Sequence, residues 1–303
     1  MPNFPRLRGM IAATFTPMTE TGDINYAEIK PYADYIASTA IDGVFVNGTT
    51  GEFSSLTVEE RKKILECWIT AAAGRFKVIC HAGSNCQRDS IEIAAHAASI
   101  GAYGIGCIAP SFFKPATVND LIGFFAPIAA AAPELPFYYY NMPSITGVNL
   151  PVDRILAEGR KIIPNLAGTK FTHNNLMEME MCIDLDEGAF EVLHGYDEIL
   201  IAGLSMGAKA GVGSTYNYIP EIYDGIFRAM EAGDLTTARE LQKKSIKTVE
   251  VIIRYGGGVR GGKAIMNLIG IKCGECRSPL SPLAQEEYAA LEADLDALGF
   301  VKK

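Results

Sequence analysis

Eight short apolar runs, each ending in small or polar residues, recur through the first two thirds of the chain about every 30 residues, the length of a βα unit. Strands that are nearly continuously apolar are typical of a parallel sheet covered on both faces. Most of the runs are followed by a segment with helical spacing. The runs cover residues 10–16, 43–48, 77–83, 104–110, 136–141, 166–172, 191–195 and 208–214.

One intervening segment carries a clear helix start. Thr57-Val58-Glu59-Glu60 has the form of a capping box, in which the first side chain and the fourth each satisfy a backbone amide of the other. The apolar residues that follow recur at helical spacing and include Trp68, and Gly74 is placed to end the helix. Strand and helix therefore alternate along the chain.

Eight βα units fit a parallel barrel better than an open doubly wound sheet, which usually has fewer strands. The strand signal stops near residue 232, and three helical stretches follow at about 234–254, 262–269 and 284–298. The sequence predicts an α/β fold, a (β/α)₈ TIM barrel over 1–232 followed by a C-terminal three-helix extension over 233–303.

Charge and composition narrow the classes of function. The chain of 303 residues has a formal net charge of -8 and is 49% hydrophobic, which argues against binding to nucleic acid or to an anionic membrane. No apolar stretch reaches the ~20 residues that span a bilayer, and Met1 to Arg8 lacks the apolar core of a signal peptide. We expect a cytoplasmic protein whose partners are small molecules, with its seven cysteines reduced.

The carboxyl ends of barrel strands are where active sites form, and the most informative residue there is Lys170, in Asn165 to Thr172. Lysine is rarely buried without a partner, and a desolvated amine shifts toward the neutral nucleophile that attacks carbonyls. Alone, such a lysine is more often a surface group. Other polar residues at predicted strand ends are Thr14, Thr16, Thr49, Thr50, Glu52, His81, Tyr140, Asn141, Thr172, Asp197, Glu198 and Ser214.

A lysine among hydroxyls, with Tyr140 at the preceding strand end, is what Schiff-base chemistry requires: a nucleophile, a proton carrier and donors for a carboxylate. Each element also has a simpler interpretation. Gly48-Thr49-Thr50-Gly51 could be only a turn, although its amides and hydroxyls suit an oxyanion. Asp197-Glu198 could be a solvated pair or a helix start, and at least one of Tyr138, Tyr139 and Tyr140 should serve packing.

Two further patterns point elsewhere and are set aside. Gly257 to Lys263 resembles a P-loop, but Ala264 stands where a Ser or Thr must reach magnesium, and no strand precedes it. Cys273-Gly274-Glu275-Cys276 has the spacing of half a zinc site without a second half. The four histidines lack metal-binding spacing and are interpreted as structural.

Three motifs together resemble one family. Gly48-Thr49-Thr50-Gly51-Glu52, Tyr140-Asn141-Met142-Pro143 and Gly168-Thr169-Lys170 follow the order and spacing of the pyruvate-dependent class I aldolases that include N-acetylneuraminate lyase and dihydrodipicolinate synthase. Within that family, Gly195 to Glu198 and Gly213 to Asn217 are similar to the sugar-binding segments of the N-acetylneuraminate lyase branch.

The resemblance implies a role for each motif. Lys170 would form a Schiff base with the C2 ketone of N-acetylneuraminate, Tyr140 and Thr50 would take part in proton transfer, and Thr49 with Thr50 would bind the C1 carboxylate. The products would be pyruvate and N-acetyl-D-mannosamine, with no metal or organic cofactor. The sugar's hydroxyl tail would be held by Thr172, Gly195, Asp197, Glu198 and Ser214.

Two departures from the family pattern matter. Dihydrodipicolinate synthases place an arginine where this chain has Ile145, so their second substrate would lose its bidentate partner. Many members insert a tyrosine from a neighbouring subunit into the proton relay, and the matching residue here is Phe112, which cannot carry a proton.

Other functions stay open at this point: an aldolase for a different 2-keto-3-deoxy sugar acid, a dihydrodipicolinate synthase-like enzyme, or a non-catalytic sialic-acid-binding relative. The family also implies a homotetramer assembled as a dimer of dimers.

Overall fold

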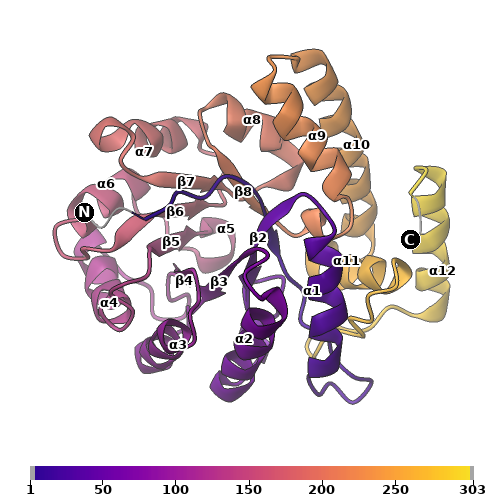
Figure 1. Ribbon diagram of the computed structural model, residues 1–303, viewed down its shortest axis with the longest axis horizontal. Helices are drawn as coiled ribbons and strands as arrows, with labels where there is room; N and C mark the ends of the chain where they lie inside the picture. The colour runs from indigo at the N-terminus through magenta and orange to yellow at the C-terminus, as the bar shows by residue number, and fades with distance from the viewer. Residues whose placement is uncertain (1–3, 301–303) are drawn as a thin grey trace. The chain divides into compact units, whose positions relative to one another are not determined.

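The computed structural model describes residues 4–300, so the first three residues of the Met1–Arg8 segment lie outside the described part. Eight strands follow one another around a closed barrel in chain order (Figure 1). Each of the eight apolar runs overlaps one of them, which confirms the predicted (β/α)₈ fold. The strands are β1 Gly9–Ala13, β2 Ile41–Val46, β3 Lys77–His81, β4 Gly104–Ile108, β5 Phe137–Asn141, β6 Leu166–Phe171, β7 Glu191–His194 and β8 Ala210–Gly213.

The chain divides into two compact units, which we describe separately. The first unit comprises Lys77–Val212 and the chain up to Gly9. Its strands pair in parallel from β3 to β8, and its outer helices contact one another and strands β4, β6 and β7. The helices are α3 Gln87–Ser99, α4 Val118–Ala130, α5 Pro143–Thr146, α6 Val152–Gly159, α7 Leu176–Gly188 and α8 Leu200–Ser205.

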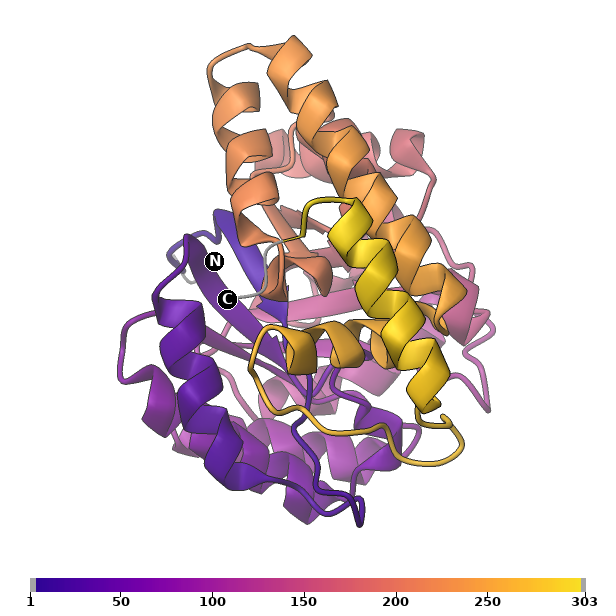
Figure 2. The same ribbon diagram turned by 90° about the vertical axis from the view of Figure 1, so that its right-hand side faces the viewer.

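The second unit comprises Met10–Phe76 and the chain from Gly213 on. It holds the parallel β1–β2 pair and the predicted C-terminal helices. The long α10 contacts α9, α11 and α12, as Figure 2 shows in orange and yellow. The helices are α1 Ile29–Ala37, α2 Val58–Ala72, α9 Pro220–Glu231, α10 Leu235–Arg254, α11 Gly257–Leu268 and α12 Gln285–Ala297. The division at residues 232 and 233 stays a prediction.

One helix start differs from the expectation. Helix α11 begins at Gly257, five residues before the predicted stretch 262–269. The prediction started too late because glycine has a low helix propensity, so the glycine-rich segment was not expected to be helical. Its glycines serve close packing instead. A Cβ on Gly261 would lie 2.9 Å from the Ile252 carbonyl oxygen, and one on Gly262 would lie 2.7 Å from the Phe15 ring.

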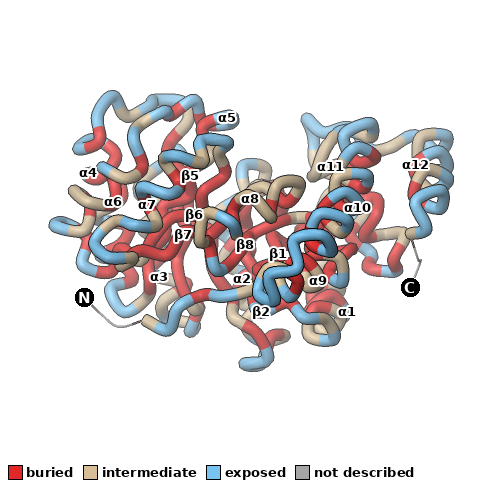
Figure 3. Tube along the Cα trace, turned by 90° about the horizontal axis from the view of Figure 1, so that it is seen from above, coloured by how far each residue is buried: buried red, intermediate tan, exposed pale blue. Residues whose placement is uncertain are grey.

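Local sequence signals explain how the elements form. At the start of α2, the Thr57 side chain accepts a hydrogen bond from the Glu60 amide and the Glu60 carboxylate accepts one from the Thr57 amide, which confirms the predicted capping box. The apolar face of this helix buries Trp68 edge-on against Tyr32 of α1, with ring centroids 5.1 Å apart. Buried residues follow the strands and the inner helix faces (Figure 3).

Within residues 4–300, no helix is long and apolar enough to cross a membrane.

Candidate active site

Lys170 lies at the fifth position of β6 and is 5% exposed. The strand brings it there through close packing with its neighbours. A Cβ on Gly168 would lie 1.9 Å from the Glu191 carbonyl oxygen, so this position of β6 accepts only glycine, and the Thr169 hydroxyl donates to the Tyr139 carbonyl at 2.8 Å. The predicted position of Lys170 at a strand end is confirmed, and the structure adds that the side chain is buried and not at the surface. Burying an amine is costly, which favours a functional role for it.

Tyr140 lies directly beside Lys170, because the two residues are paired in the β5–β6 register. The lysine Nζ lies 4.1 Å from the centroid of the Tyr140 ring, within range of a cation–π contact. The His81 ring also meets the Tyr140 ring edge-on, with centroids 5.8 Å apart. The phenol donates to the Met142 sulfur at 3.1 Å, and thioether sulfur is a weak acceptor, so this bond holds the phenolic proton only weakly.

Tyr138 and Tyr139, the two tyrosines before Tyr140, form structural contacts. Tyr138 donates from its hydroxyl to the Glu191 carboxylate at 3.0 Å, and Tyr139 packs on Phe125 of α4 and donates to Asn141 at 3.2 Å. Burial raises the pKa of both phenols above the ordinary value. The expectation that part of this tyrosine run serves packing is confirmed.

The ends of β6 and β7 meet at Thr172 and Gly195. Thr172 is 4% exposed, and its hydroxyl oxygen has no hydrogen-bond partner among the described residues. A Cβ on Gly195 would lie 2.0 Å from that hydroxyl, so the absence of a side chain at Gly195 lets the two strand ends approach. A buried hydroxyl without a partner is costly, which suggests that a bound molecule completes its bonding.

Two carboxylates follow Gly195 at the start of the 3₁₀ helix Asp197–Ile199. Asp197 is buried and Glu198 is half-buried, so the interpretation of this pair as a helix start is correct, and the pair is not simply solvated. His194, the last residue of β7, is fully buried, and desolvation lowers its pKa to about 4. Neutral His194 packs closely against α8, where a Cβ on Gly203 would lie 2.4 Å from its ring.

In the second unit, the segment 47–52 follows β2 as a tight turn. Asn47 and Glu52 both have left-handed backbone conformations, with φ of 60° and 58°. The Glu52 amide donates to the Thr49 carbonyl at 3.0 Å, and Thr16 donates to the Gly51 carbonyl at 2.8 Å. Thr50 is buried, whereas Thr49 is half-buried. The prediction of a turn is confirmed, and the turn is held from several sides.

Ser214 directly follows β8 and is half-buried. Its carbonyl accepts from the Asn217 side-chain amide at 2.7 Å, and the same amide donates to the Ala13 carbonyl of β1 at 2.8 Å. Asn217 also accepts from the Tyr32 hydroxyl. This network fixes the backbone at Ser214.

The two residues that depart from the family pattern are exposed. Ile145 of α5 is 63% exposed, and Phe112 is 78% exposed with its ring edge-on to Phe113 at 5.0 Å. The Asn85 side chain accepts from the amide of Phe112 at 3.1 Å, which fixes the backbone of this loop. Across residues 4–300, no three His, Cys, Asp or Glu side chains gather as a metal ion would require.

Sequence reasoning missed one polar cluster. Lys263, in the segment that resembled a P-loop, is 1% exposed and forms an ion pair of 2.7 Å with Glu52 of the Thr49–Thr50 turn. The sequence carried one signal for this cluster. The run of small residues before Lys263 indicates that this face of α11 packs inside the protein, and a lysine there needs a buried partner.

Comparison with known proteins agrees with the fold and the motifs. The model of the dihydrodipicolinate synthetase family matches residues 6–298. N-acetylneuraminate lyase of Mus musculus is 43% identical, covering 98% of this chain and 95% of its own. The solved structure of Proteus mirabilis N-acetylneuraminate lyase superposes with a TM-score of 0.95 at 37% identity, covering 98% and 100%.

A second branch of the family is also similar. The structure of dihydrodipicolinate synthase from Aquifex aeolicus superposes with a TM-score of 0.90 at 28% identity, covering 98% of this chain and 100% of that one. The family model spans nearly the whole chain, and the solved structures share its fold. The chain therefore belongs to the dihydrodipicolinate synthetase family.

Proposed function

We propose that this protein cleaves N-acetylneuraminate reversibly to pyruvate and N-acetyl-D-mannosamine through a Schiff base on Lys170. The observation that carries the proposal is a buried lysine at the end of β6, 4.1 Å from the ring of Tyr140. It occurs in a chain 43% identical to an N-acetylneuraminate lyase over 98% of its length. The fold supports it as well, because the strands of such a barrel carry their reactive residues at their carboxyl ends.

The chemistry begins at the ketone. Lys170 adds as a free amine through Nζ to C2 of the open-chain sugar acid, and the carbinolamine takes up a proton from solvent and loses water to give an iminium ion. Tyr140, whose own phenolic proton has first passed to solvent water, takes the proton of the C4 hydroxyl as the C3–C4 bond breaks, and the electron pair of that bond moves into the iminium to form an enamine. N-acetylmannosamine leaves as the aldehyde. Protonation of the enamine at C3 and hydrolysis by water release pyruvate and restore Lys170.

Substrate binding divides between two groups of residues. The amides and hydroxyls of Thr49 and Thr50 hold the C1 carboxylate, and Thr50 joins Tyr140 in proton transfer. The tight turn of 47–52 supports this role, because successive backbone amides in a turn favour anions. The hydroxyl tail of the sugar binds to Thr172, Gly195, Asp197, Glu198 and Ser214. The buried Thr172 hydroxyl without a partner supports a polar ligand there.

Ile145 supports the choice of branch. Its apolar side chain cannot hold a second carboxylate in the way that an arginine would, which argues against dihydrodipicolinate synthase activity. The remaining alternatives, another 2-keto-3-deoxy sugar acid or binding without turnover, differ in what the enzyme releases.

The experiment is therefore a substrate panel. Pyruvate release should be fastest with N-acetylneuraminate and much slower with 2-keto-3-deoxygluconate, and Asp197→Ala should reduce this preference because it removes an acceptor for the polyol. Equal rates with both substrates would favour a different sugar-acid aldolase. Tight binding of N-acetylneuraminate without pyruvate release would favour a non-catalytic relative.

The assembly is proposed as a cytoplasmic homotetramer built as a dimer of dimers. Two adjacent exposed aromatic rings, Phe112 and Phe113, at 78% and 86% exposure, support burial of this loop against another subunit. Sedimentation equilibrium should give four times the mass of the chain. A monomer at micromolar concentration would contradict the assembly.

A further inference from the structure

Glu52 has an unusual backbone for its residue type. It ends the Thr49–Thr50 turn with φ of 58°, in the left-handed region that only glycine and a few small polar residues adopt readily. It is also 5% exposed. Such a conformation persists where the surrounding structure enforces it, and it occurs most often at functional sites.

The Glu52 carboxylate is held entirely by the C-terminal part of the chain. Oε1 accepts from Lys263 Nζ at 2.7 Å, and Oε2 accepts from the Arg277 backbone amide at 2.9 Å. Lys263 Nζ donates further to the Glu275 carbonyl at 2.8 Å. The two side chains of the ion pair are 1% and 2% exposed, so water screens their attraction very little.

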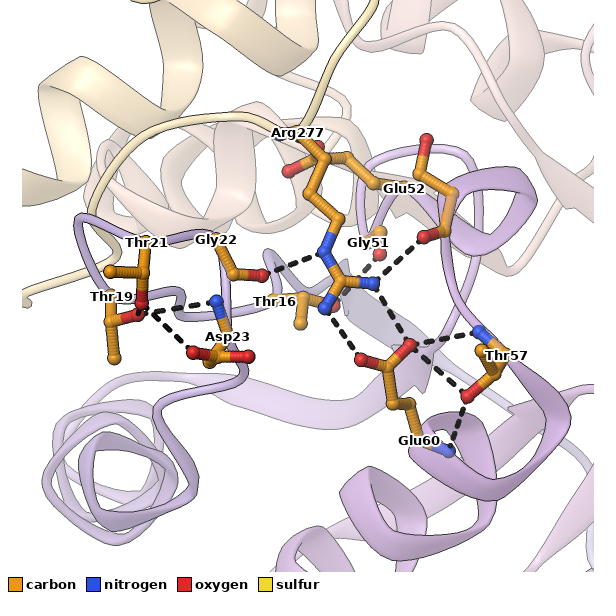
Figure 4. Close-up of polar contacts among 11 residues, drawn as sticks. Thr16, Thr19, Thr21, Gly22, Asp23, Gly51, Glu52, Thr57, Glu60 and Arg277 are labelled. Atoms are coloured by element: carbon orange, nitrogen blue, oxygen red, sulfur yellow. Dashed lines mark hydrogen bonds and ion pairs between the residues drawn. The ribbon is translucent and has the colours of Figure 1, made fainter.

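The Arg277 side chain anchors the same segment a second time (Figure 4). Its guanidinium donates to the Gly22 carbonyl at 2.7 Å, to the Ser55 carbonyl at 2.8 Å, and through two nitrogens to the Glu60 carboxylate at 2.8 and 2.5 Å. Glu60 in turn caps α2. Arginine is the residue that makes such planar, two-pronged contacts, so the segment has one defined position.

Displacement of Glu52 would move the turn. The Glu52 amide bonds to the Thr49 carbonyl, and the next amide, that of Phe53, bonds to the Gly48 carbonyl at 3.3 Å. Gly51 has little space, since a Cβ there would lie 3.2 Å from the Thr14 carbonyl oxygen and 3.3 Å from the Thr16 hydroxyl. The side-chain contacts of Glu52 tie the far end of the turn to α11 and to the segment after it.

We propose that Lys263 and Arg277 are positioning residues: they hold Glu52 in its left-handed conformation and thereby aim the amides and hydroxyls of Thr49 and Thr50 at the substrate carboxylate. The C-terminal extension then contributes to catalysis and not only to stability. This inference rests on the proposed function.

The test measures carboxylate recognition separately from folding. Borohydride traps the imine of pyruvate on Lys170, and the pyruvate concentration that gives half-maximal trapping reports how well the carboxylate is held. In Lys263→Met this concentration should rise about 10-fold, the effect of one weakened charged contact. For pyruvamide, which lacks the carboxylate charge, it should change less than about 2-fold.

Two further variants separate positioning from loss of stability. Lys243→Met removes a lysine from a surface ion pair with Glu240 in the same unit and should match the wild type. Glu52→Gln/Lys263→Met removes both buried charges, which should allow folding if Lys263→Met alone does not fold. The pyruvate concentration that gives half-maximal trapping in this double variant should still be several-fold higher than in the wild type.

The outcomes are distinct. The positioning role is overturned if folded Lys263→Met, or the folded double variant Glu52→Gln/Lys263→Met, needs the same pyruvate concentration as the wild type for half-maximal trapping. This holds even if the melting temperature of the variant falls. An equal rise for pyruvate and pyruvamide also overturns it, because the carboxylate is then not the group affected. If wild-type protein traps no pyruvate at all, the proposed function fails and not merely this inference.

Discussion

The protein buries two lysines in different surroundings, one in each unit. Lys263 is 1% exposed and lies in an ion pair with Glu52, with a further bond to the Glu275 carbonyl. Lys170 is 5% exposed, and its Nζ lies over the face of the Tyr140 ring. A lysine that donates to a carboxylate and a carbonyl has its protons directed at those oxygens, whereas the face of an aromatic ring attracts an amine through the ring quadrupole.

The contrast shows that burial alone does not mark a catalytic lysine. The partner of the amine decides whether it acts as a fixed cation or as a nucleophile. We propose that Lys263 positions the Thr49–Thr50 turn and that Lys170 is the nucleophile. Substitutions at the two positions should therefore fail in different ways.

The largest effect is expected at Lys170. Lys170→Met should lower pyruvate release by about 10³-fold or more, because no other group can form the imine, while the melting temperature stays near that of the wild type. Steady-state assays and calorimetry check the two parts. Lys209→Met, an exposed lysine of the same unit, is the matched control. Substantial activity in Lys170→Met would remove the distinction between the two lysines.

Lys263→Met should fail in stability as well as in carboxylate binding. It leaves the Glu52 charge buried without its counter-ion, which should cost about 3–5 kcal/mol of unfolding free energy. Glu52→Gln/Lys263→Met should recover most of this loss. Urea unfolding measures both variants, and a loss below about 1 kcal/mol for the single variant would mean that the pair is energetically unimportant.

His194 predicts a pH dependence in the first unit. Its pKa of about 4 in the folded protein lies below the ordinary 6.5, so the unfolded chain binds a proton first as the pH falls. The contribution of neutral His194 to the free energy of unfolding is complete above pH 6.5. It is lost between pH 6.5 and 4, by about 3 kcal/mol in total. His194→Gln should flatten the stability curve in that window. His173→Gln is the control. If the stability of His194→Gln depended on pH as that of the wild type does, the assignment of this pH dependence to His194 would be wrong.

Glu60 should act at lower pH in the second unit. Its bonds to Arg277 are the main cause that lowers its pKa from 4.5 to about 2. Stability from this carboxylate is therefore present above pH 4.5 and lost between 4.5 and 2, a window that lies mostly below that of His194.

Tyr140 gives the smallest of these five effects. Tyr140→Phe keeps the ring against Lys170 and removes only the phenolic hydroxyl, so pyruvate release should fall about 10²-fold, as for loss of a general acid–base. Trapping of pyruvate by borohydride should remain. Loss of trapping together with turnover would assign Tyr140 to imine formation instead of C3–C4 cleavage.

The sequence predicted those features that local patterns determine. Eight apolar runs gave the eight strands, and the Thr57 capping box gave the start of α2. The predicted strand at 166–172 correctly placed Lys170 near a strand end. The ion pair of Lys263 with Glu52 spans 211 positions of the chain, so no local pattern could reveal it. The early start of α11 was missed because packing against Ile252 and Phe15 overrides the low helix propensity of glycine.

The central claim is that Lys170 is the nucleophile, and reduction of the imine tests it most directly. After incubation with pyruvate and borohydride, peptide mass spectrometry should find one reduced pyruvate moiety on Lys170 and none on Lys263. An adduct on another lysine, or no adduct in protein that releases pyruvate from N-acetylneuraminate, would contradict the account.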